Sequence, residues 1–340
     1  MTTTSNIVVI PESTSPAARL WRGFVAVQKE YPALQLVAIA VILLIGANLL
    51  PGLLNPNGIR LMLVMAALTG LAALGQTLVI IIGGIDLSIA SVIGAAGLAV
   101  SQLPGKYGID FGVVFIGVII GAALLGAGIG YVSHRFDLNP LIISLGAGAF
   151  ALGVVYVLKG GYFTGTAPSW LGSFMSPVST TFGLPIPPVV MLWIVVAIIM
   201  FVLFTWTASG RRLSAVGTNR RAADLSLVKS RRIWVIVFMI SAVGSAVVGT
   251  LLAGYSGSAD LTQGNTYMFQ SLAAVVVGGT MMGGKGDYNR TITGALLITA
   301  LNTVLIGLGF SSADQQILFG AVILISVVVY GRERRLRDRI

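Results

Sequence analysis

Two glycine-rich stretches have the spacing of loops that bind phosphate groups. Gly279-Thr-Met-Met-Gly-Gly284-Lys285-Gly286 has the glycines and the lysine of a phosphate-binding loop, but Gly286 stands where that loop carries the Ser or Thr that binds magnesium. Gly146-Ala-Gly148-Ala-Phe-Ala151 has the spacing of a dinucleotide-binding turn, but it lies inside an apolar stretch typical of a helix. Neither stretch follows a buried strand, so we predict that this chain binds no nucleotide.

The remaining reactive groups are too few for the common catalytic and metal sites. The chain has no cysteine, which excludes disulfides and thiolate metal sites, and one histidine, His134. His134 and Asp137 could form an acid–base pair, but with Arg135 beside them at the edge of an apolar segment they are typical of a polar rim. We therefore predict no catalytic residue, no metal site and no cofactor, and we do not expect an enzyme.

Asp86 is the carboxylate lodged between two consecutive apolar segments. It lies in the sequence Gly83-Gly84-Ile85-Asp86-Leu87-Ser88. Gly83 and Gly84 can end a helix, and Asp86 or Ser88 can cap the next one by accepting its free N–H groups. We predict that these four residues form a helix break and a contact with a second subunit. The alternative is an ion or proton site, because acidic side chains within a membrane are often functional.

Composition shows which elements position these residues. Of 340 residues, 56% are hydrophobic and only 9% are charged, and the mean hydropathy is +0.94. Soluble domains carry about 25% charged residues, because their surface must be hydrated. The composition therefore predicts an all-α integral membrane protein, since helices satisfy their own backbone hydrogen bonds in lipid.

Apolar segments near or above the length of a membrane span, about 20 residues, divide the chain into ten predicted helices. They cover residues 33–59, 61–85, 87–105, 111–133, 138–158, 188–208, 233–259, 261–284, 291–313 and 315–331. Residues 160–187 are rich in Gly and Pro and are predicted to be a loop. The transmembrane domain is thus residues 32–331, between a polar segment, 1–31, and a basic tail, 332–340.

The basic residues indicate which loops face the cytoplasm. The net charge is +10, from 21 Lys and Arg against 11 Asp and Glu. If both termini are cytoplasmic, 18 of the 21 basic residues fall inside, and only Arg60, Lys106 and Lys159 fall outside. Cytoplasmic loops carry this excess in membrane proteins, so the distribution supports ten spans with both termini inside. It also argues against a nucleic-acid partner, because the charge does not form a single binding surface.

A faint internal duplication relates two of these regions at an offset of 201 residues. Leu71-Ala72-Ala73 matches Leu272-Ala273-Ala274, Gly83 matches Gly284, and Asp86 matches Asp287. Five identities in a sequence rich in Gly and Ala are only a hint. Both copies would cross the membrane in the same direction, so they would not form an inverted repeat.

The longest predicted cytoplasmic loop, 209–232, is the most informative polar stretch. Gly217 is expected to form a turn and Asn219 to cap a short helix over 220–227. Ala222, Ala223 and Leu225 would then form a small apolar patch. Such a helix could fit into the groove of a partner protein, or its basic surroundings could lie on anionic lipid. The residues alone leave both readings open.

Several motifs, in order from about residue 60 to 330, resemble the permeases of ribose-type ABC importers. They comprise Gly75-Gln76-Thr77-Leu78-Val79-Ile80 with Gly83 to Ser88, Asn139-Pro140-Leu-Ile-Ile-Ser-Leu-Gly146, Ala215-Val216-Gly217-Thr218-Asn219 with Ala222 to Ser226, and Val277-Gly278-Gly279-Thr-Met-Met-Gly283-Gly284. Many relatives have a second Gly where Thr218 stands. They often have another Gly just beyond Ser226, where this chain has Leu227 and Val228.

The resemblance implies a transmembrane permease subunit in the bacterial inner membrane that translocates a sugar such as a pentose or hexose. Its partners would be a cytoplasmic ATPase, an extracytoplasmic solute-binding protein, a second permease copy and membrane lipid. The residues that would form the coupling helix seated in the ATPase are Gly217, Asn219, Ala222, Ala223, Leu225 and Ser226. The solute-binding protein would deliver sugar at the outside loops, chiefly 159–187 and 255–266.

The residues leave two points open. The cargo could instead be a nucleoside or an amino acid, and an ion-coupled secondary transporter is a further alternative for which only Asp86 could serve as the coupling group. The sequence assigns no substrate-binding residues. Polar residues within the spans could line a pathway or form hydrogen bonds between helices, as for Gln76, Ser144, Asn302 and Thr303.

Overall fold

The computed structural model describes residues 32–160, 165–259, 262–284 and 286–337, so the predicted segment 1–31 and the last tail residues lie outside it. Its helices are α2 (Ala33–Leu49), α3 (Pro56–Ile81), α4 (Ser88–Tyr107), α5 (Phe111–Arg135), α6 (Pro140–Lys159), α7 (Ser169–Met175), α8 (Pro188–Trp206), α9 (Ala208–Thr218), α10 (Arg220–Leu225), α11 (Ser230–Ser256), α12 (Gln263–Val277), α13 (Tyr288–Gly307) and α14 (Ser312–Arg337). The described residues form no strand beyond an isolated bridge between Thr181 and Leu184. The all-α prediction is confirmed.

Each of the ten predicted segments overlaps one main helix, and the first, 33–59, also runs into the start of α3 at Pro56. Seven helices, α3, α4, α5, α6, α8, α11 and α13, are long and apolar enough to cross a membrane in the described part of the chain. The apolar parts of α2 and α14 are shorter, at Ala33–Leu49 and Ser312–Val328. The chain is therefore a helical membrane protein, whereas the count of ten and the location of both termini stay predictions.

The observed boundaries differ from the predicted ones where proline or glycine controls the backbone. Helix α3 begins at Pro56 and includes Arg60, because proline suits the first turn of a helix, where no N–H partner is needed. Helix α12 ends at Val277, well before the predicted residue 284, and Gly279 follows with a positive φ of 90°. Charge-free length alone marks the spans but not their ends.

Two regions that we predicted as loops contain helices. The stretch 160–187 includes α7, and the stretch 209–232 begins with the three-turn helix α9. The Thr207 side chain caps α9 by accepting a hydrogen bond from the Gly210 N–H at 3.3 Å. Within 209–232 we predicted the short helix over 220–227 but not α9 before it, because its polar and basic residues form a helix only where one face packs on the protein. Leu213 and Val216 form that buried face.

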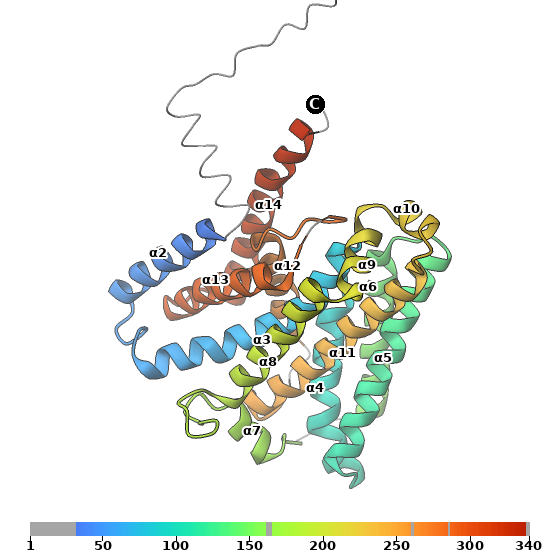
Figure 1. Ribbon diagram of the computed structural model, residues 1–340. Coiled ribbons are helices and arrows are strands. Elements are labelled where there is room, and N and C mark those ends of the chain that lie inside the picture. The colour runs from blue at the N-terminus through green and yellow to red at the C-terminus, as the bar shows by residue number, and fades with distance from the viewer. Residues whose placement is uncertain (1–31, 161–164, 260–261, 285, 338–340) are drawn as a thin grey trace, which may run out of the picture.

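Helix α3 lies at the centre and is buried on all sides along its second half. Helix α11 packs against α3, α4 and α5, while α12 and α13 contact α3 and each other. Figure 1 shows α2, α12 and α13 on one side of α3, and α4, α5 and α11 on the other. Helices α7 and α10 lie at opposite ends of this bundle (Figure 1). The two predicted docking regions are thus far apart.

Small residues allow α5 and α11 to approach closely. A methyl group at Gly126 would overlap the Phe238 carbonyl oxygen, and one at Gly130 would lie against the Trp234 backbone. Glycines four residues apart permit such contacts between membrane helices, where apolar side chains gain little by leaving lipid. This close packing, the α5–α11 seam, holds the end of α5 beside the start of α11.

Candidate functional site

The first helix break joins α3 to α4 through a glycine turn. The Gly84 N–H donates to the Val79 carbonyl at 2.9 Å and the Gly83 N–H to the Ile80 carbonyl at 3.0 Å. Gly83 has φ of +88°, a conformation that costs other residues energy. The pair of glycines therefore ends α3 in the way that the sequence predicts.

Asp86 is fully buried immediately beyond this turn. Its Oδ1 accepts hydrogen bonds from the Ser88 N–H at 2.9 Å and the Ser88 Oγ at 2.6 Å. Its Oδ2 accepts one from the Ser241 Oγ of α11 at 2.6 Å. The carboxylate thus satisfies the first N–H of α4, as we expected of a cap, and it also ties this helix to α11. Contact with a second subunit stays a prediction.

Ser88 and Ser144 complete the enclosure of the first break. Ser88 is the first residue of α4, and its hydroxyl donates to Asp86 instead of capping the helix itself. The Leu87 N–H donates to the Ser144 Oγ of α6 at 2.9 Å. Three helices outside the break, α6, α11 and the end of α3, therefore hold its backbone in place.

The second break, between α12 and α13, repeats this design with a longer connection. The Thr280 N–H donates to the Val275 carbonyl at 3.2 Å and the Gly279 N–H to the Val276 carbonyl at 3.0 Å. This is the same pair of bonds as in the first break. As there, an aspartate precedes the next helix. Asp287 caps α13, accepting a hydrogen bond from the Arg290 N–H at 2.9 Å.

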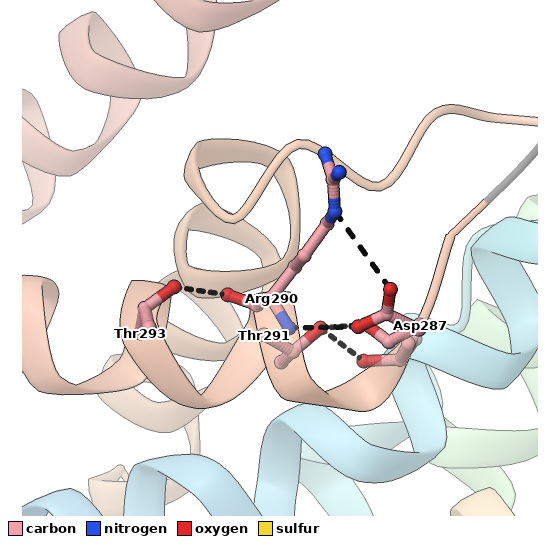
Figure 2. A network of polar contacts seen from close by, with 5 residues as sticks. Asp287, Arg290, Thr291 and Thr293 are labelled. Carbon is pink, nitrogen blue, oxygen red and sulfur yellow. Dashed lines mark hydrogen bonds and ion pairs between the residues drawn. The ribbon is translucent and has the colours of Figure 1, made fainter. Parts of the chain in front are cut away.

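Figure 2 shows that the contacts of Asp287 stay within the first turns of α13. Its Oδ2 lies 3.7 Å from the Arg290 Nε, and its main-chain oxygen accepts from the Thr291 Oγ1 at 3.5 Å. The Thr293 hydroxyl bonds to the Arg290 carbonyl one turn further on (Figure 2). The Thr291 Oγ1 also lies 2.9 Å from the Thr77 Oγ1 of α3, and this hydroxyl pair joins α13 to α3.

The two breaks and α9 meet at three glycines. The Gly283 N–H donates to the Ile80 carbonyl at 3.0 Å, and the Cα of Gly283 faces Gly83. Gly217, near the end of α9, has no room for a methyl group, because its β-carbon would overlap the Ile81 carbonyl oxygen. We refer to Gly83, Gly217 and Gly283 as the glycine junction. It places α9 in direct backbone contact with the end of α3.

The expected role of Gly217 as a turn was wrong. Gly217 lies within α9, and the chain leaves the helix only at Asn219. Asn219 caps α10, as predicted, by accepting a hydrogen bond from the Ala222 N–H at 3.0 Å. Glycine is thus needed at position 217 for close approach to α3, which a single sequence cannot distinguish from a turn.

Helix α10 presents a different apolar surface from the one that we predicted. Ala223 is buried against the protein, so it cannot belong to an exposed patch. Leu225 and Leu227 are 86% and 89% exposed and point away from the bundle, while Ala222 and Ser226 are also exposed. Ala223 therefore anchors the helix, and the two leucines form the protruding apolar tip.

An ion pair that the sequence did not indicate fastens α10 to α5. The Arg220 Nη1 lies 2.9 Å from the Asp137 Oδ1, and the Arg220 Nη2 donates to the His134 carbonyl at 3.2 Å. The His134 Nε2 lies 2.8 Å from the Ser230 Oγ at the start of α11. His134 and Asp137 are thus part of a structural joint, and 83 residues separate the partners in sequence.

The four polar residues that we singled out within the spans divide into two groups. Ser144 and Thr303 bond to backbone groups, the latter to the Thr299 carbonyl of its own helix. The Gln76 Oε1 and the Asn302 Oδ1 are buried and lack a hydrogen-bond partner among the described residues. The described residues contain no group of three or more His, Asp or Glu side chains that could hold a metal ion.

The chain is similar to a family model and to several known permeases. Residues 58–327 match the family model described as branched-chain amino acid transport system, permease component. The chain is 35% identical over 307 residues to the ribose import permease protein RbsC of Bacillus subtilis, covering 89% of this chain and 92% of that protein.

Two further relatives cover similar lengths. The ribose import permease protein RbsC of Haemophilus influenzae is 33% identical over 86% of this chain and 90% of its own length. The D-allose transport system permease protein AlsC of Escherichia coli is 28% identical over 86% of this chain and 89% of its own length. No solved structure matches the chain.

Proposed function

The chain belongs to the family of permease components of branched-chain amino acid transport systems, and we propose that it is the membrane subunit of an ATP-driven importer for a monosaccharide. The observation that carries this proposal is the similarity along nine-tenths of the chain to permeases named for ribose. The relative named for D-allose supports the same class of cargo. The family description itself names branched-chain amino acids, so an amino acid is the second candidate.

In this proposal the chain moves the solute and a separate ATPase supplies the energy. The family description is that of a permease component of a transport system, which implies an ATPase and a solute-binding protein as partners. Helix α10, with Leu225 and Leu227 exposed at its tip, is the part that would seat in the ATPase. Small exposed helices with apolar anchors fit grooves in partner proteins.

Motion of α10 would reach the membrane helices through α9. Helix α10 follows α9 after a single residue, Asn219, and Gly217 of α9 lies against the Ile81 carbonyl. Gly283 of the second break is bonded to the adjacent Ile80 carbonyl. A displacement of α9 therefore changes backbone contacts at both breaks together. ATP binding shifts the permease between outward-facing and inward-facing states only if the ATP-bound ATPase binds one of these states more tightly than the other.

The opposite end of the bundle would receive the solute-binding protein. Helix α7 and residues 165–187 lie at the end remote from α10 (Figure 1), consistent with the predicted outside loops 159–187 and 255–266. Ten spans, both termini in the cytoplasm and a second permease copy complete the proposed assembly. The large exposed apolar faces of α5, α6 and α8 suit lipid or such a copy.

Replacing Leu225 with Asp tests the coupling role. We expect the variant to insert normally but to lose co-purification with its ATPase and to lose ATP-dependent uptake, since a carboxylate would enter an apolar groove. Leu184, which is 49% exposed near the opposite end, provides the matched control. Leu184→Asp should retain the ATPase.

Uptake of labelled ribose into proteoliposomes, with leucine as competitor, tests the cargo. Saturable uptake that leucine does not reduce is expected. Uptake driven by an ion gradient without any ATPase would contradict the proposed mechanism, and full coupling in Leu225→Asp would contradict the role of α10.

A further inference from the structure

A basic cavity lies at the rim where α5, α10 and α11 meet. Its volume is about 560 Å³, and its lining includes Arg135, Lys229, Arg231 and Arg232 together with the ion-paired Arg220. Asp224 is the single carboxylate of the lining, and its Oδ1 accepts a hydrogen bond from the Ser230 N–H at 3.3 Å. The cavity is therefore strongly positive.

Four of its cations have no ion-pair partner in the described part of the chain. Arg220 is paired with Asp137, whereas Arg135, Lys229, Arg231 and Arg232 are exposed and pair with no described carboxylate. Like charges held together raise the free energy of the site. An anion in the cavity would relieve this repulsion, and phosphate is the anion for which clustered Arg and Lys are best suited.

The surroundings of the cavity indicate that this anion belongs to a lipid. On α5, Tyr131 lies one turn inward from Arg135 on the same face and is 46% exposed. On α11, Ile236 lies one turn inward from Arg232 and is also 46% exposed. On both helices an exposed cation therefore stands just outside an exposed apolar side chain, which is the order of head group and acyl chain in a lipid.

The floor of the cavity is a built structure. The His134 Nε2 and the Ser230 Oγ lie 2.8 Å apart and join the end of α5 to the start of α11. The Trp234 ring packs edge-on to His134 and faces the Arg220 guanidinium at 5.9 Å. The tight α5–α11 seam below keeps these groups in place, so the cations converge on a fixed space.

We propose that this cavity binds the phosphate head group of an anionic phospholipid, with its acyl chains along Tyr131 and Ile236. Basic cavities between membrane helices at the cytoplasmic face bind such head groups. The bound lipid would neutralise the rim beside α10. This inference rests on the proposed topology, which puts α10 at the cytoplasmic face, and not on the cargo.

Lipid retention by the purified full-length chain in detergent, measured by native mass spectrometry, tests the proposal. The probes are phosphatidylglycerol and phosphatidylcholine of identical acyl chains. We expect preferential retention of phosphatidylglycerol, and on the order of tenfold weaker retention in the double variant Arg231→Gln with Arg232→Gln, since each cation contributes to attraction of an anionic lipid.

Arg211 and Arg212 of α9 form the matched control, because they are an adjacent exposed pair outside the cavity lining. Arg211→Gln with Arg212→Gln should change retention less than twofold. Equal losses in both double variants would show general charge attraction and overturn the proposal. Unchanged retention in the cavity variant, with a normal elution profile and unfolding temperature, would also overturn it.

Two further arms distinguish other occupants. Displacement of phosphatidylglycerol by micromolar inorganic phosphate would assign the cavity to a free anion and overturn the lipid assignment. Loss of ATPase co-purification in the cavity variant, without any change in lipid retention, would assign these arginines to a protein contact. The lipid proposal expects retention to fall whether or not the ATPase is present.

Discussion

The two helix breaks share one design but differ in how their aspartates are held. In both, a glycine turn ends one helix and an aspartate accepts an N–H group from the first turn of the next. Asp86 is fully buried and bonds to Ser241, which is 155 residues away. Asp287 is part-exposed, and the bonds of its side chain stay within its own helix, to Arg290.

This difference separates a tertiary anchor from a local cap. Removing a buried acceptor leaves each of its donors without water or partner, and each such donor costs about 1–3 kcal/mol. A part-exposed cap can be replaced by water. The first break should therefore be intolerant of substitution, while the second should be able to rearrange during transport.

The largest effect is expected from Asp86→Ala. Three donors, the Ser88 N–H, the Ser88 hydroxyl and the Ser241 hydroxyl, would lose their acceptor. We expect destabilisation of about 3 kcal/mol or more and little monodisperse protein in detergent, measured by fluorescence-detected size exclusion. Asp86→Asn keeps an acceptor and should be milder, with no pH dependence of uptake. Normal yield of the alanine variant would contradict the anchor role.

Gly217→Ala should have the next largest effect, because it disrupts the packing of α9 at the glycine junction, where both breaks meet. The added methyl would force α9 away from the Ile81 carbonyl, and overpacking of this kind costs about 1–3 kcal/mol. We expect reduced uptake per ATP hydrolysed, together with a lower unfolding temperature. Gly128→Ala in α5 is the control, since a methyl there meets nothing within 4 Å. Equal uptake per ATP and equal unfolding temperatures in the two variants would show that α9 is not closely packed at the glycine junction.

Asp287→Ala should destabilise the chain by about 1 kcal/mol, the usual loss for a helix cap. The Arg290 N–H that loses its acceptor lies near the surface, where water can replace the carboxylate. The unfolding temperature compared directly with that of Asp86→Ala measures the contrast between the breaks. Equal losses for the two alanine variants would show that the second break is as rigid as the first.

The smallest effect is expected from Arg290→Gln. Its ion pair with Asp287 spans 3.7 Å, and both side chains are about one-third exposed. Such pairs contribute roughly 0–1 kcal/mol, because water screens the charges. The salt-dependent part of the change in the free energy of unfolding should not exceed this amount, as thermal unfolding at low and high salt would measure. A larger, salt-sensitive loss would indicate that Asp287 is held by charge and not by the helix end.

Local signals in the sequence were sufficient for the features that one segment determines by itself. The cap at Asn219, the short helix after it and the break at Gly83 were predicted correctly, because each depends on neighbouring residues. The contacts of Gly217, the burial of Ala223 and the pairing of Arg220 with Asp137 were not predicted. Each of these depends on a partner that is distant in sequence.

The sequence by itself determined the membrane environment, the all-helical class and, through its motifs, the permease family. These follow from hydropathy, from the positions of glycine and proline between apolar segments, and from short motifs in a fixed order. None of them requires knowledge of contacts between residues that are distant in sequence. Only the tertiary structure decided which face of α10 is free, how α9 reaches both breaks, and that Arg135 and Arg232 share one cavity. The physical reason is that backbone contact and convergence of charge arise only when helices far apart in the chain pack together.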